Sequence, residues 1–166
     1  MILPRIFICG DSFSDDTWGS LGVRMKRFGP AITSWVEQLE QDFEIIRMAR
    51  VKSSNEEILE QVQSCPVDAI KCVNLTTLSR TNRGLDPWPA ERTSIKSIYK
   101  IVKTQNTYIW SPTQEYEDIS FIDWIPLKDH NEMYSPEVDV VGCHFTLEGN
   151  RLLYTHIKEK LRRINE

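Results

Sequence analysis

The sequence has no long apolar run, no basic stripe and no closely spaced pair of cysteines. Its apolar runs fall far short of the roughly 20 residues of a membrane-spanning helix. The amino terminus lacks the charged start and long apolar core of a signal peptide. The net charge is −4 and the basic residues are scattered, which gives nucleic-acid binding no electrostatic support. We therefore expect a cytoplasmic protein with neither a nucleic-acid nor a membrane partner.

The cysteines argue against a metal centre. Cys9, Cys65, Cys72 and Cys143 form no C-x-x-C pair, so a zinc site is not expected. Cys9 and Cys72 lie in mostly apolar runs and are expected to be small buried hydrophobic residues. The sequence predicts free thiols and no cofactor.

What the chain does contain is an alternation of strand-like and helix-like segments. Its 166 residues, 40% of them hydrophobic, suffice for one globular domain over residues 1–166. Strands are expected at residues 5–9, 43–49, 68–75, 107–110 and 138–141, and helices at 32–41, 56–64, 93–103 and 146–163. This order predicts a three-layer α/β/α sandwich of the flavodoxin-like type, with a parallel sheet of about five strands.

Capping residues predict where two of the helices begin. Thr33 or Ser34 is expected to cap the first, in which Trp35 belongs to the core face. Ser54 or Asn55 is expected to cap the second. Residues 115–134 are acidic and aromatic without a period, and predict an irregular segment packed on the domain.

The chain is organised around Gly10-Asp11-Ser12, which ends the first strand. Ligands of open α/β sheets bind at the carboxyl ends of the strands. A serine there is either a nucleophile whose own N–H is an oxyanion donor, or part of an N-capping pair before a helix. The rest of the chain has to distinguish these two interpretations.

Other polar groups are expected at the same edge of the sheet. They lie in the 52–55 loop, in the 76–80 loop and at His144, just before the last helix. His144 is the best placed of three histidines to serve Ser12 as a base. His130 lies in the irregular segment, and His156 falls on the apolar face of the last helix, where a core position is expected.

Two sequence blocks resemble those of a known family. Gly10-Asp11-Ser12-Phe13-Ser14-Asp15 is similar to the first block of the SGNH (GDSL-type) hydrolases, and residues 144–150 are similar to their last block. Residues 48–58 resemble the second block, and Leu75-Thr76 with Arg80 resembles the third-strand exit of small phage-type and bacterial members. The resemblance covers almost the whole chain. It implies the SGNH fold and ester hydrolysis without a metal, with Ser12 as nucleophile, His144 as general base and Asp11 as a structural brace.

The chain departs from the family pattern in the expected oxyanion donors. Lys52 stands near the position of the second-block glycine, and Lys52 or Ser53 would shape the pocket there. The third block has no asparagine at the usual position, where Thr77, Ser79 or Arg80 would have to substitute. Asn74 lies a little earlier, within the strand.

The carboxylate that would orient His144 is also displaced. The usual position, three residues before the histidine, is Val141, while Asp139 lies five residues before it. A bend through Gly142 would bring Asp139 to the imidazole. Otherwise a backbone carbonyl orients the ring in a Ser-His dyad, and Asp123 and Asp129 are outside candidates.

The sequence thus favours a serine esterase that cleaves a small ester or an acetylated carbohydrate through an acyl-Ser12 intermediate. Four tryptophans are candidate contacts for the sugar or acyl group, and for each the alternative is packing in the core or in a loop: Trp18, Trp88, Trp110 and Trp124. The first alternative is a binding or structural module of the same fold without activity, for instance a virion-associated phage component. The second is a flavin-binding protein with residues 12–17 as a phosphate loop.

Overall fold

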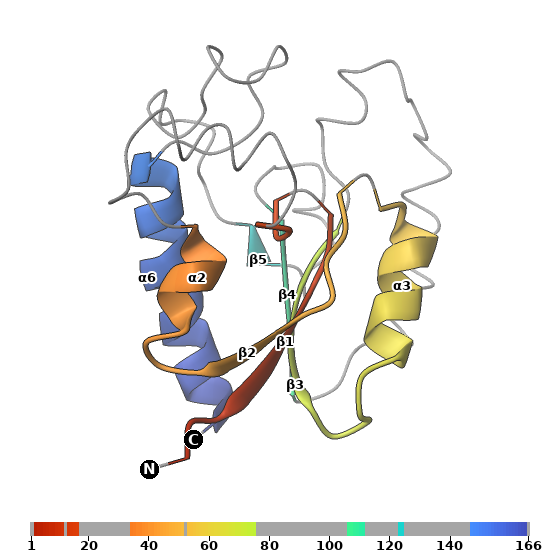
Figure 1. Ribbon diagram of the computed structural model, residues 1–166, viewed down its shortest axis with the longest axis horizontal. Coiled ribbons are helices and arrows are strands. Elements are labelled where there is room, and N and C mark those ends of the chain that lie inside the picture. The colour runs from red at the N-terminus through yellow and green to blue at the C-terminus, as the bar shows by residue number, and fades with distance from the viewer. Residues whose placement is uncertain are drawn as a thin grey trace.

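The structure, a computed structural model, describes residues 2–11, 13–16, 34–51, 53–75, 106–111, 123–124 and 147–165. Five strands form one parallel sheet: β1 (Arg5–Cys9), β2 (Glu44–Arg47), β3 (Ile70–Asn74), β4 (Thr107–Ser111) and β5 (Asp123–Trp124). The helices of this part are α2 (Trp35–Leu39), α3 (Asn55–Gln63) and α6 (Leu147–Asn165). Figure 1 shows α2 and α6 on one face of the sheet and α3 on the other. The predicted α/β/α arrangement is confirmed.

The strand order places β1 at the point where the sheet changes direction. The order is β2-β1-β3-β4-β5, so the chain first builds outward on one side of β1 and then on the other. This is the order of a flavodoxin-like doubly wound sheet, which binds its ligands outside the carboxyl end of the first strand. The residues that follow Cys9 therefore occupy the position where such folds carry their sites.

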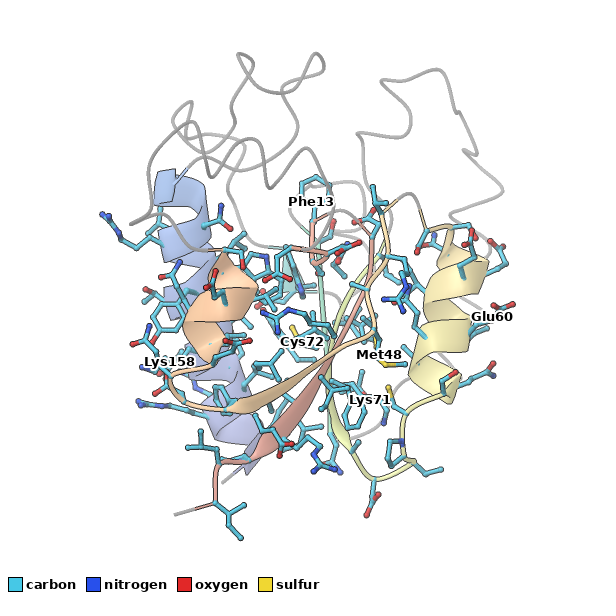
Figure 2. All side chains as sticks on the ribbon, in the orientation of Figure 1. Phe13, Met48, Glu60, Lys71, Cys72 and Lys158 are labelled. Atoms are coloured by element: carbon cyan, nitrogen blue, oxygen red, sulfur yellow. The ribbon has the colours of Figure 1, made fainter. Side chains whose placement is uncertain are left out.

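The alternation of side chains along β1 divides the interior into two cores. Ile6 and Ile8 face α2 and α6, while Phe7 and Cys9 face α3. Trp35 lies in the first core, with its ring edge-on to Trp110 at a centroid distance of 5.5 Å, so its predicted core position is confirmed. In Figure 2, Cys72 lies on the side of α2 and α6, whereas Lys71 lies toward α3.

Both predicted helix caps are confirmed. The Ser34 side chain accepts a hydrogen bond from the Glu37 N–H at the start of α2. Ser54 forms a capping box with Glu57 at the start of α3, in which each side chain bonds the other's backbone. The second strand ends earlier than predicted, because the N–H groups of Met48 and Ala49 both donate to the Ile8 carbonyl instead of continuing the ladder.

The fifth strand is the main difference from the prediction. β5 lies within residues 115–134, which were expected to be irregular. It consists of two residues paired with the end of β4, too short for a hydrophobic period to reveal it. The strand predicted at 138–141 and the helix predicted at 93–103 lie outside the described residues. No helix in the described ranges is long and apolar enough to cross a membrane.

Candidate active site

A glycine is required where β1 ends. Gly10 has a φ of +151°, which residues with a side chain rarely adopt. A Cβ at this position would also lie 1.8 Å from Oδ1 of Asn74. The Gln61 side chain, from α3, accepts from the Gly10 N–H at 2.7 Å and donates to the Gly10 carbonyl at 3.1 Å. The backbone is thus fixed on both sides immediately before Asp11 and Ser12.

Asp11 braces the turn that follows. Its carbonyl accepts the N–H groups of Ser14 and Asp15, at 3.0 and 2.9 Å. Its buried carboxylate accepts the Phe13 N–H at 3.1 Å and the amide of Asn74 at 2.9 Å. Ser12 lies outside the described residues, but the residues on either side of it are buried and bonded.

Asn74 has a role that sequence reasoning did not assign. It is the last residue of β3, as predicted within a strand, and it is fully buried. Its amide group donates to Asp11 and to the Leu75 carbonyl, and its oxygen accepts from the Ser14 hydroxyl. The available signal was a single amide at the carboxyl end of a buried strand, because a buried amide needs partners.

The loop after β2 packs directly on this turn. The Arg50 N–H donates to the Gly10 carbonyl at 3.1 Å, and the Val51 N–H donates to the Asp15 carboxylate at 2.9 Å. Ser53, of which 1% is exposed, donates its hydroxyl to the Arg50 carbonyl and accepts from Gln61. The loop that resembles the second family block is therefore bonded to the turn that resembles the first.

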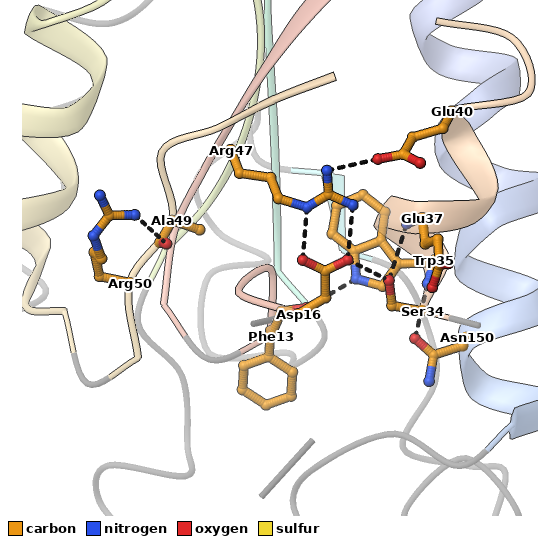
Figure 3. A network of polar contacts seen from close by, with 10 residues as sticks. All are labelled: Phe13, Asp16, Ser34, Trp35, Glu37, Glu40, Arg47, Ala49, Arg50 and Asn150. Atoms are coloured by element: carbon orange, nitrogen blue, oxygen red, sulfur yellow. Dashed lines mark hydrogen bonds and ion pairs between the residues drawn. The ribbon is translucent and has the colours of Figure 1, made fainter. Parts of the chain in front are cut away.

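A charged cluster anchors the end of the turn to β2. Figure 3 shows Arg47 forming two bonds to Asp16, at 2.8 and 3.0 Å, and a third to Glu40 at 2.6 Å. The Ser34 hydroxyl donates to the same Asp16 carboxylate at 2.8 Å. The hydrogen bond to Asp16, followed by that to Glu40, raises the pKa of the Arg47 guanidinium despite its burial, so Arg47 stays charged.

Trp35 links the turn to the start of the last helix. Its indole N–H donates to the Phe13 carbonyl at 2.8 Å, and its backbone N–H donates to the Asn150 side chain at 3.0 Å (Figure 3). Phe13 directly follows Ser12, and α6 begins three residues after His144. One residue therefore contacts both segments next to the two predicted catalytic residues.

Most of the predicted site residues lie outside the described ranges. Asp11 and Ser53 are described; Ser12, Lys52, Thr77, Ser79, Arg80, Asp129, His130, Asp139 and His144 are not. Trp18 and Trp88 are not described either, nor is the side chain of Trp124. Trp110 is fully buried against Trp35, which is the core packing expected as the alternative to a substrate contact.

Asp123 and His156 belong to a polar cluster with Tyr108 and Lys160. The Asp123 carboxylate accepts from the Tyr108 hydroxyl at 2.5 Å, lies 3.0 Å from Nε2 of His156 and lies 3.7 Å from Nζ of Lys160. The hydrogen bond from His156, and then that from Tyr108, lowers the pKa of Asp123 to about 2 against the effect of burial. His156 is half-buried at this cluster, so its expected place in the core is wrong. Among the described residues, no group of three or more side chains is arranged to hold a metal ion.

Solved structures of other proteins share the fold of this chain. No family model matches the sequence, and no curated protein matches it. The structure is similar to that of TesA, with a TM-score of 0.61 and 12% identity over 96% of this chain and 99% of that one. It is also similar to a lipase/acylhydrolase from Enterococcus faecalis, with a TM-score of 0.50 and 10% identity over 96% and 95% of the two chains. The chain therefore shares the fold of these two proteins, an α/β/α fold with a parallel sheet, as its sequence blocks led us to expect.

Proposed function

We propose that the protein is a serine ester hydrolase that acts through an acyl-Ser12 intermediate. The observation that carries the proposal is the double contact of Trp35, which bonds Phe13 beside Ser12 and Asn150 in the first turn of the helix after His144. A nucleophile and its base must come within hydrogen-bond reach although 132 positions of sequence separate Ser12 from His144. A contact that brings the two flanking segments together supports that pairing.

In the proposed reaction, His144 takes the Ser12 proton as the hydroxyl oxygen attacks the ester carbonyl carbon. The Ser12 N–H donates to the oxyanion that develops. His144 then protonates the departing alcohol, and a water molecule activated by the same imidazole hydrolyses the acyl-enzyme. The Gly10–Gln61 and Asp11–Asn74 bonds keep the turn fixed before the reaction, so no reorganisation is needed when charge develops.

The contacts of the described residues suggest which groups support the two proposed catalytic residues. The Ser53 hydroxyl bonds Arg50 and Gln61, so Ser53 acts as a brace and the neighbouring Lys52 N–H is the proposed second oxyanion donor. Thr77 and Arg80 are proposed to line the same pocket, and Asp139 to orient His144. We propose small acyl esters or O-acetylated carbohydrates as the substrate class, because acetyl and short acyl groups suit this chemistry without a cofactor.

A fluorophosphonate probe tests the nucleophile directly. Label is expected in the tryptic peptide of residues 6–24, which contains three serines, and the fragment spectrum should place it on Ser12 and not on Ser14, whose hydroxyl is bonded to Asn74. Ser12→Ala and His144→Ala should each reduce p-nitrophenyl acetate hydrolysis by about a thousandfold or more. His156→Gln is the matched control and should retain activity, because His156 bonds Asp123 and neither residue has a role in the proposed reaction. A wild-type protein that neither takes the label nor hydrolyses the ester would refute the proposal.

A second candidate function is a binding or structural module of the same fold. One observation favours it: both amide hydrogens of Asn74 are used, by Asp11 and by the Leu75 carbonyl, so this asparagine does not supply the side-chain donor that the third block usually offers. A site with fewer oxyanion donors is expected to be slow. Absence of both labelling and hydrolysis in correctly folded protein is the result this candidate predicts.

A further inference from the structure

Two cysteine side chains meet between β1 and the segment after α3. The Sγ atoms of Cys9 and Cys65 lie 3.9 Å apart, although 56 positions of sequence separate the residues. Both thiols are free and buried. Cys72, the other described cysteine, belongs to the core on the opposite face of the sheet. The described part of the chain therefore offers one thiol pair that a small movement can join.

The two thiols differ in chemical character. The hydrogen bond between the two thiols, together with the nearby charge of Lys71, lowers the pKa of Cys65 against the effect of its burial. The same hydrogen bond and burial raise the pKa of Cys9. The Lys71 ammonium is buried on the same face and bonds the Val67 and Ala69 carbonyls, at 3.3 and 3.1 Å. A thiolate at Cys65 thus has a neighbouring thiol donor and a neighbouring cation.

Cys65 is also the more accessible member of the pair. It is 7% exposed, whereas Cys9 is fully buried. Its neighbours Ser64 and Pro66 are exposed, and Val67 is 88% exposed. The segment lies beyond the end of α3 and outside the strands, so a local opening that leaves the sheet intact can admit a small reagent.

We propose that Cys9 and Cys65 form a dithiol site that reacts with a small two-electron oxidant, such as hydrogen peroxide, to give an intramolecular disulfide. The Cys65 thiolate attacks one peroxide oxygen, the O–O bond breaks and hydroxide leaves, which gives a sulfenic acid. The Cys9 sulfur then attacks the Cys65 sulfur. The sulfenic oxygen leaves as water with the Cys9 proton, so two thiols and one peroxide give one disulfide and two waters.

The position of the disulfide connects this site to the turn after β1. Cys9 directly precedes Gly10, and the Cys65 thiol donates to the carbonyl of Gln61 at 3.3 Å. The Gln61 side chain in turn bonds both the N–H and the carbonyl of Gly10. Oxidation therefore adds a covalent tie beside hydrogen bonds that already fix the same stretch of backbone. The proposal does not depend on the activity proposed above.

Peptide mapping of the full chain tests the inference, because trypsin places each cysteine in a different peptide: 6–24, 53–71, 72–80 and 129–151. The reduced protein is treated with hydrogen peroxide, alkylated and digested without reductant. We expect peptides 6–24 and 53–71 to be linked, with a loss of about 2 Da for the two hydrogens, and to separate again with dithiothreitol. Free thiols at both residues, or a linkage that involves Cys72 or Cys143 instead, would overturn the proposal.

Two variants separate the steps. Cys72→Ala, the matched control on the other face, should form the linked pair as the wild type does, and loss of the link in a folded Cys72→Ala protein would count against the pairing. Cys9→Ala removes the resolving thiol, so Cys65 should then be trapped by dimedone as a sulfenic acid. Dimedone on Cys72 rather than on Cys65 would show that the reactive thiol is wrongly assigned. The wild-type map stands on its own if either variant fails to fold.

Discussion

Replacing Gly10 by alanine tests the reasoning on which the candidate site depends. The substitution adds one methyl group at the end of β1, where the φ of +151° favours glycine. The added Cβ would lie 1.8 Å from Oδ1 of Asn74 and 2.7 Å from its Cγ. Both distances are far below van der Waals contact, so the Asn74 side chain would have to move out of its buried position.

The cost has two parts that can be worked from the structure. Holding a residue with a side chain in this backbone region costs about 1–3 kcal/mol. Displacing Asn74 breaks its buried bonds to Asp11 and Ser14, which leaves polar groups without partners at a cost of about 1–3 kcal/mol. Gly10→Ala is therefore expected to lower the free energy of unfolding by roughly 2–6 kcal/mol.

Urea denaturation followed by tryptophan fluorescence measures this change, and a double-mutant cycle separates its parts. Asn74→Ala removes the obstacle and loses the same hydrogen bonds. The loss of unfolding free energy in the double variant should therefore be smaller than the sum of the losses in the two single variants, by about 1–3 kcal/mol. The conformational cost of alanine at position 10 should persist in the double variant. Additivity to within about 0.5 kcal/mol, or a Gly10→Ala protein as stable as the wild type, would refute the steric argument.

Two further substitutions probe contacts of the described residues. Because the pKa of Asp123 in the folded protein, about 2, lies below its ordinary value of 3.8, its contribution to stability is present above about pH 4 and is lost as the pH falls toward 2. Asp123→Asn should lower the free energy of unfolding by about 1–2 kcal/mol at pH 7, a value reduced for the 30% exposure of this side chain. In urea titrations the difference from the wild type should shrink toward pH 2. A difference that is the same at every pH would contradict the assignment. Trp35→Phe keeps an aromatic ring but removes the indole N–H that bonds the Phe13 carbonyl. It should therefore lower the free energy of unfolding by about 1 kcal/mol and slow the fluorophosphonate labelling of folded protein. Labelling at the wild-type rate would argue against a role for this link in the site.

The elements that could be predicted are those whose signal is local. Short, mostly apolar runs of strand-forming residues at 5–9 and 70–74 predict buried strands, and Ser54 with Glu57 predicts a helix start. The order of these segments restricts the sheet to a parallel arrangement with helices on both faces. β5 was not predicted because a strand of two residues has no hydrophobic period. It is a strand because it pairs with the end of β4.

The candidate site also contains residues that the sequence could identify and residues that it could not. Gly10, Asp11 and Ser53 could be selected from the sequence because they belong to short blocks with a known order. Asn74 and Gln61 could not, since each lies inside a strand or helix and acts on a segment more than 50 positions away. The buried amide of Asn74 indicates only that it needs partners, because a hydrogen bond between distant segments leaves no sequence pattern that identifies the two residues it joins.

The sequence by itself predicted the order of the first four strands and of the described helices, the turn after the first strand and the two residues proposed for catalysis. Each depends on residues close together in the chain, whose propensities and spacing act before the chain is folded. Only the tertiary structure decided what holds that turn: Gln61 from α3, Asn74 from β3 and Trp35 from α2. It also decided that the side chains of Cys9 and Cys65 are in contact, and that His156 bonds Asp123 instead of packing in the core. The physical reason is that these contacts exist only once the sheet brings its strands and helices into register.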